Sequence, residues 1–92
     1  HGVKEIMYCN ADSWLFSGLP SQMYCGRYHS WVVSRESFPE CLRIVATDAA
    51  GRIMAFEHRN LPVWGVQFHP ESYMTEMGMS MIRNWLLYQR EN

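Results

Sequence analysis

The sequence predicts an α/β fold in which several short β-strands are followed by one C-terminal helix. Turn residues divide residues 3–68 into short runs that are rich in β-forming side chains. After Thr75 the spacing of apolar residues changes to that of an amphipathic helix. With 92 residues the chain is too short for a second domain.

Six runs have the composition of strands, and Gly, Pro, Asn, Asp and Ser separate most of them. They cover residues 3–9, 23–28, 31–33, 42–47, 53–58 and 63–68. The segment Asp48–Gly51 carries good turn chemistry and predicts a hairpin between the fourth and fifth runs. The run 63–68 is apolar at nearly every position, which predicts a central strand buried on both faces.

The helix is expected over residues 75–89. Its apolar positions follow the spacing i, i+3, i+4, i+7 and i+8, and they are Gly78, Met81, Ile82, Trp85 and Leu86. We expect this face to cover one side of the sheet. A piece of this kind leaves a sheet face or edge uncovered, and we expect the isolated chain to form homo-oligomers through that apolar surface.

Composition narrows the classes of partner. The net charge is −1 with acids and bases interspersed, so neither nucleic acid nor a membrane surface is a favoured partner. No apolar run approaches the length of a membrane span, and the N-terminus lacks the features of a signal peptide. Three cysteines suit a reducing compartment, so we expect free thiols and a cytoplasmic location. Because residue 1 is His and not Met, we expect the chain to begin inside a longer gene product.

The residues best suited to chemistry are His69 and Glu71. Pro70 disfavours a helical conformation at His69, and in an extended segment residues i and i+2 project to the same side. The Glu71 carboxylate can then accept a hydrogen bond from one ring nitrogen and orient the other as a general base. The alternative is a surface histidine after a strand, followed by an exposed glutamate.

Four segments in order resemble class I (triad) glutamine amidotransferases. Residues 65–72 read Gly-Val-Gln-Phe-His-Pro-Glu-Ser, residues 27–33 read Arg-Tyr-His-Ser-Trp-Val-Val, residues 16–20 read Phe-Ser-Gly-Leu-Pro, and residues 1–4 read His-Gly-Val-Lys. Within this class the chain is most similar to the amidotransferase components of anthranilate synthase and aminodeoxychorismate synthase.

The resemblance implies a fold and a chemistry. The fold would be a three-layer mixed sheet, of which residues 1–92 form the C-terminal portion of a single domain. His69 would activate a cysteine thiol, Glu71 would orient His69, and L-glutamine would be hydrolysed through a glutamyl thioester. Ammonia would pass to a chorismate-using synthase subunit, and no cofactor or metal is implied. The implied substrate-binding residues are Tyr28, His29, Ser30 and Trp31.

The family's nucleophile lies in a Gly-x-Cys-x-Gly-x-Gln elbow, and the sequence contains no such string. Cys9, Cys25 and Cys41 do not replace it, so the chain alone is expected to be inactive. Two alternatives stay open at this point. One is a non-catalytic interaction module, and the other is a small metal-binding domain built on Cys25 and His29, with Cys9 or His69 as further ligands.

Overall fold

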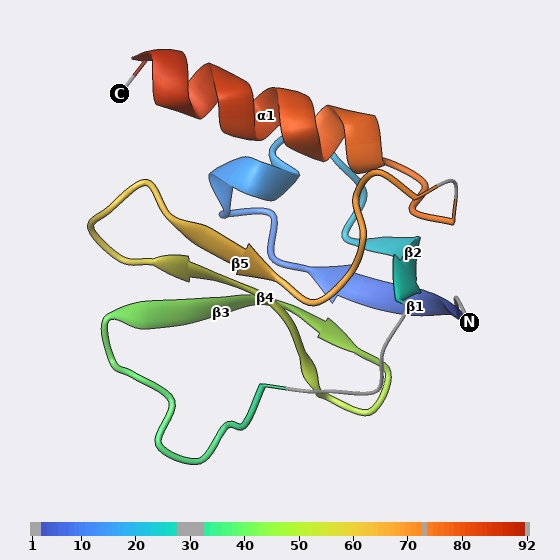
Figure 1. The fold of residues 1–92 in the computed structure, drawn as a ribbon, viewed down its shortest axis with the longest axis horizontal. Helices are drawn as coiled ribbons and strands as arrows, with labels where there is room; N and C mark the ends of the chain where they lie inside the picture. Colours follow the sequence, from blue (N-terminus) through green and yellow to red (C-terminus); the bar gives the residue numbers. More distant parts are fainter. Residues whose placement is uncertain (1–2, 28–32, 73, 92) are drawn as a thin grey trace.

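The computed structural model describes residues 3–27, 33–72 and 74–91. It confirms an α/β fold with short strands followed by a C-terminal helix (Figure 1). The elements are β1 (Val3–Cys9), the short 3-10 helix η1 (Trp14–Phe16), β2 (Gln22–Arg27), β3 (Leu42–Asp48), β4 (Ile53–His58), β5 (Trp64–Val66) and α1 (Gly78–Glu91). No helix in the described ranges is both long and apolar enough to span a membrane.

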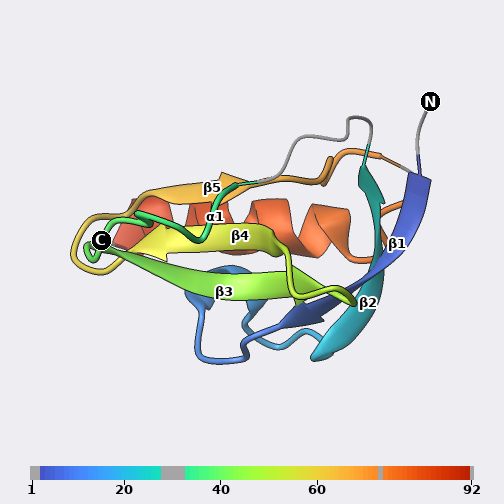
Figure 2. The same cartoon turned by 90° about the horizontal axis from the view of Figure 1, so that it is seen from below.

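The five strands form one sheet in the order β2-β1-β3-β4-β5, and every neighbouring pair is antiparallel. The sheet is strongly bent, so that β1 and β2 run across the direction of β3, β4 and β5 (Figure 2). The segment that leaves β5 then passes beside β2 before α1 begins (Figure 1). Residues from the two ends of the strand order are therefore brought together.

The predicted hairpin between β3 and β4 is confirmed. Its turn is held by Asp48, whose Oδ1 accepts the backbone N–H groups of Ala50 and Arg52 at 3.0 and 2.8 Å. Gly51 has φ +81°, a left-handed conformation that favours glycine. The local turn chemistry therefore specified this part of the fold correctly.

The prediction of a central strand over residues 63–68 was wrong. Only Trp64–Val66 is a strand, and it lies at the edge of the sheet, paired on one side with β4. Val66 is 39% exposed rather than buried. An apolar run indicates that a segment tends to be buried. It does not specify the position of that segment in the strand order of the sheet. Of the predicted run 31–33, Val33 forms an isolated bridge with Ile53, and the rest lies outside the described residues.

The core lies between the sheet and the layer formed by η1 and α1 (Figure 1). Its largest fully buried side chains include Met7, Phe16, Met54 and Met81. The expected apolar face of the helix is covered only over its first part. Trp85 and Leu86, farther along the helix, are 41% and 50% exposed.

One asparagine joins α1 to η1. The Asn84 side-chain amide donates to the carbonyls of Leu15 and Ser17 at 2.9 and 3.0 Å. The Asn84 backbone carbonyl accepts the indole N–H of Trp14 at 2.6 Å. These contacts, together with the edge-on packing of Trp14 against Tyr88, set the position of the helix over the sheet.

Candidate functional site

The His69 and Glu71 side chains are in contact. Nδ1 of His69 lies 2.8 Å from Oε2 of Glu71, and the two side chains are 36% and 66% exposed. Their predicted proximity is therefore confirmed. The extended conformation expected for residues 69–71 was wrong, because the chain turns there and the Ser72 N–H donates to the His69 carbonyl at 3.1 Å. The role of the pair in catalysis stays a prediction.

The surroundings of Glu71 stabilise its ionised carboxylate. Its pKa is held below the usual 4.5, first by its own backbone N–H and then by the hydrogen bond to the His69 ring. The carboxylate is therefore ionised throughout the neutral range. An ionised partner at Nδ1 favours the tautomer that carries its proton there, which makes Nε2 the basic nitrogen of the ring. This is the arrangement that a general base needs.

The turn that carries His69 is bonded to β2. The His69 N–H donates to the Gly26 carbonyl at 2.8 Å, and the Glu76 N–H donates to the Tyr24 carbonyl at 3.1 Å. The carboxylate of Glu76 also accepts a hydrogen bond from the Tyr24 N–H at 2.7 Å. Residues 69–72 and 74–76 therefore lie along the outer edge of β2, and His69 lies beside the end of that strand.

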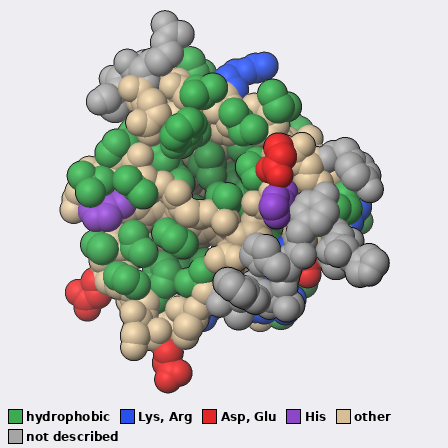
Figure 3. Space-filling model, in the orientation of Figure 1, with side chains coloured by type: hydrophobic (Ala, Val, Ile, Leu, Met, Phe, Trp, Pro, Cys, Tyr) green, Lys and Arg blue, Asp and Glu red, His purple; other side chains and the backbone are tan. Residues whose placement is uncertain are grey.

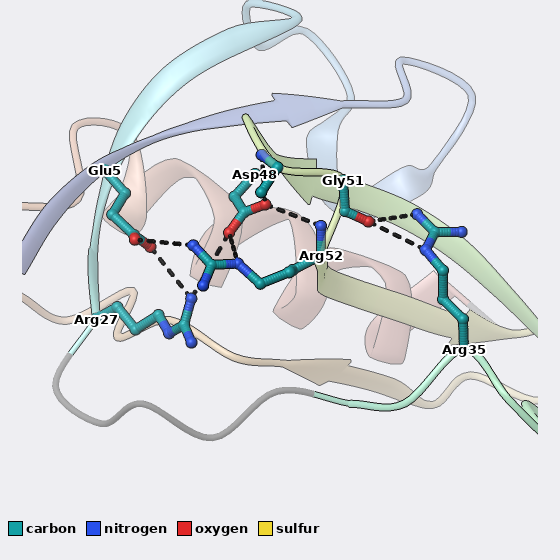
Figure 4. Close-up of polar contacts among 7 residues, drawn as sticks. Glu5, Arg27, Arg35, Asp48, Gly51 and Arg52 are labelled. Carbon is teal, nitrogen blue, oxygen red and sulfur yellow. Dashed lines mark hydrogen bonds and ion pairs between the residues drawn. The ribbon is translucent and has the colours of Figure 1, made fainter.

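The same end of β2 holds a partly buried charge network that the sequence analysis did not find (Figure 4). Arg27 is 5% exposed, and its NH1 lies 3.4 Å from Glu5 and 3.7 Å from Asp48. Arg52 contacts the same two acids, with Nε 2.6 Å from Asp48 and NH2 3.7 Å from Glu5. Two positive and two negative groups thus balance at the residue that precedes the predicted substrate-binding segment. No sequence signal pairs Arg27 with Glu5 or Asp48, which lie on other strands.

The four residues predicted to bind substrate lie outside the described residues. They are Tyr28, His29, Ser30 and Trp31. The structure describes the residue that precedes them, Arg27, which ends β2 near His69.

The three cysteines are free, as predicted. Cys9 and Cys25 lie in the core, where burial raises the pKa of each thiol to about 12. A thiol with so high a pKa is almost entirely protonated at neutral pH and is a poor nucleophile. Cys41 is exposed in the loop before β3. Among the residues that the structure describes, no three His, Cys, Asp or Glu side chains are grouped to hold a metal ion.

An apolar hollow lies next to the turn that carries His69. It encloses about 210 Å³ between η1, β5 and α1, and green apolar side chains surround it on the face shown in Figure 3. Its lining is Leu15, Trp64, Val66, Phe68, Pro70, Met81, Ile82 and Trp85. Both Val66 and Trp85 are partly exposed at its rim, which continues the uncovered faces of β5 and α1.

The fold and the His–Glu pair define a known class of protein. Residues 1–88 match the family described as glutamine amidotransferase class-I, and the chain belongs to this family. The family resemblance of the four sequence motifs is thereby confirmed.

Relatives show which members the chain is similar to. It is 45% identical over 78 residues to the aminodeoxychorismate/anthranilate synthase component 2 of Bacillus subtilis, and the match covers 84% of this chain and 40% of that protein. It is 46% identical over 87 residues to the anthranilate synthase component 2 of Mycobacterium tuberculosis, and the match covers 94% of this chain and 37% of that protein. The chain thus spans less than half the length of these relatives.

A solved structure has the same fold. It is a Thermoplasma acidophilum protein described as a subunit of GMP synthase, with a TM-score of 0.84 and 26% sequence identity. The match covers 96% of this chain and 45% of that one. The structural comparison supports the class I amidotransferase fold for the five strands and the terminal helix.

Proposed function

We propose that this chain supplies the general base His69 and its orienting partner Glu71 to a glutamine amidotransferase. The observation that carries the proposal is the 2.8 Å contact between the two side chains, in a chain that belongs to the amidotransferase family. The names of the relatives support anthranilate or aminodeoxychorismate synthesis as the use of the ammonia. The partner would then be a chorismate-using synthase subunit in the cytoplasm.

The chemistry divides between this chain and a nucleophile outside its 92 residues. His69 Nε2 would take the proton of a cysteine thiol, and the thiolate would attack the side-chain amide carbon of L-glutamine. The imidazolium would protonate the leaving ammonia, and water activated by the same nitrogen would hydrolyse the glutamyl thioester. Glu71 would stabilise the imidazolium at each stage. No step requires a metal or a cofactor.

The nucleophile is assigned outside the chain for two reasons. The sequence lacks the elbow motif of the family, and the two thiols in the core have pKa values of about 12. We therefore propose that residues 1–92 are the C-terminal portion of one amidotransferase domain, inactive alone. Tyr28, His29, Ser30 and Trp31 are proposed to bind glutamine in the complete domain.

The test is glutaminase activity of the natural gene product that carries this sequence. His69→Asn removes the base and is expected to lower kcat by about 10³-fold or more, and Glu71→Gln by about 10²- to 10⁴-fold. Glu36→Gln, which neutralises an exposed loop carboxylate, is the matched control and leaves kcat unchanged.

Two outcomes would contradict the proposal. One is full activity of His69→Asn. The other is an inactive wild-type protein that still binds a synthase subunit, which would favour a non-catalytic interaction module. Measuring ammonia-dependent and glutamine-dependent product formation with each chorismate-using synthase identifies the partner.

A further inference from the structure

A buried threonine hydroxyl links the two backbones that meet at the candidate site. Thr75 is 5% exposed. Its Oγ1 accepts the Gly26 N–H at 2.8 Å and donates to the His69 carbonyl at 2.6 Å. The hydroxyl therefore acts as a donor on one side and as an acceptor on the other. Few side chains other than serine and threonine can do both with one atom in so small a space.

The bridge is part of a closed set of bonds. The His69 N–H donates to the Gly26 carbonyl at 2.8 Å, so that both backbone groups of Gly26 and both of His69 are engaged in the contact. The two segments are also packed closely. A Cβ at Gly26 would lie 2.8 Å from Oγ of Ser72 and 3.0 Å from Cβ of Met74. The position of His69 relative to β2 is therefore fixed by both hydrogen bonds and steric contact.

From this geometry we infer that Thr75 is a positioning residue, which sets the position of the base His69 relative to Gly26 in β2. The inference rests on the proposed function. Gly26 is two residues from Tyr28, where the predicted glutamine-binding residues begin, and the Thr75 bridge joins Gly26 to the residue that carries the base. A displacement of about 1 Å in such a site costs roughly 10²-fold in rate.

The test compares three variants of the natural gene product. Thr75→Val keeps the shape and removes the hydroxyl. The buried Gly26 N–H then loses its partner, and the His69 carbonyl loses the Thr75 bond while it keeps the bond from the Ser72 N–H. We expect kcat for glutamine hydrolysis to fall about 10- to 100-fold, with KM changed less than about threefold. Thr75→Ser restores the hydroxyl and is expected to keep kcat within about threefold of the wild type. Thr47→Val, at a partly exposed position in β3, is the matched control and leaves kcat unchanged.

A purely structural role for Thr75 would lower the melting temperature of Thr75→Val without changing kcat at a temperature where all variants are folded. That result would overturn the inference, and so would equal loss of activity in Thr75→Ser and Thr75→Val. If Thr75→Val does not fold, Gly26→Ala replaces it. Its Cβ pushes the His69 turn away while the hydroxyl stays, and kcat is expected to fall to a similar extent.

His69→Asn separates this inference from the proposed function. Loss of activity in His69→Asn with unchanged kcat in Thr75→Val and Gly26→Ala overturns the role of Thr75 and leaves the proposed function standing. A folded wild-type protein without glutaminase activity overturns both.

Discussion

Replacing Gly78 with alanine should destabilise the chain, although alanine is normally the better helix former. Gly78 is buried at the first position of α1, and an added Cβ would overlap the Pro70 carbonyl oxygen. Contacts of a Cβ below 3.0 Å essentially do not occur, so the helix start and the turn must move apart. The obstacle is backbone, and it lies in the turn that hydrogen bonds attach to β2 at Gly26.

The two opposing energies differ in size. Alanine gains up to about 1 kcal/mol over glycine within a helix, and less at its first turn. Overpacking against a fixed backbone costs about 1 to 3 kcal/mol, and this displacement belongs at the upper end of that range. We expect a net loss of about 2 kcal/mol, which corresponds to a decrease in melting temperature of roughly 10 °C for a domain of this size.

Differential scanning calorimetry of the wild type and Gly78→Ala measures the decrease directly. Met79→Ala is the control, because Met79 is on the same helix and 72% exposed, and we expect its melting temperature to change by less than about 3 °C. An unchanged or higher melting temperature of Gly78→Ala would refute the close approach of α1 to Pro70.

Three further predictions concern charge, thiols and assembly. Burial would raise the pKa of Asp48, but the hydrogen bonds from Arg52 and Ala50 outweigh this effect and hold the pKa below 3.8. The ionised Asp48 therefore stabilises the folded state fully at neutral pH. This stabilisation is lost as the pH falls from about 4 through the lower pKa of the folded state. Asp48→Asn should cost about 3 kcal/mol at pH 7 and flatten the acid limb of a urea-unfolding series, and an unchanged acid limb would contradict this. A thiol reagent at pH 8 should label one cysteine per folded chain, Cys41, and rapid labelling of Cys9 or Cys25 would show that the core is open. Because β5 and α1 leave apolar surface uncovered, the isolated chain should self-associate at micromolar concentration, which a monodisperse monomer in light scattering would disprove.

The features that the sequence predicted correctly are those whose cause is local. The β3–β4 hairpin depends on four turn residues, and the His69–Glu71 contact joins residues two positions apart. The apolar run 63–68 was misplaced at the centre of the sheet, because strand order depends on pairing between distant segments.

The contacts that sequence analysis missed are long-range. The hydrogen bond from Gly26 to Thr75 spans 49 residues, and the ion pair between Arg27 and Asp48 joins different strands. In the sequence, a threonine before a helix looks the same as an N-terminal cap. An arginine at the end of a strand likewise looks the same as a solvent-exposed charge. These side chains find their partners only in the folded chain, on segments distant in the sequence.

The bonds of Asn84 to the η1 region carry a consequence for the order in which the molecule folds. They join residues that are 67 to 70 positions apart, whereas β3 with β4 and β4 with β5 pair neighbouring segments. Closing the longest loops costs the most chain entropy, so the strand pairs should form first and α1 should dock late. Weakening the Asn84 contacts would then speed unfolding far more than it slows refolding. The lifetime of the folded state, rather than the speed of reaching it, would depend on the contacts of this one residue.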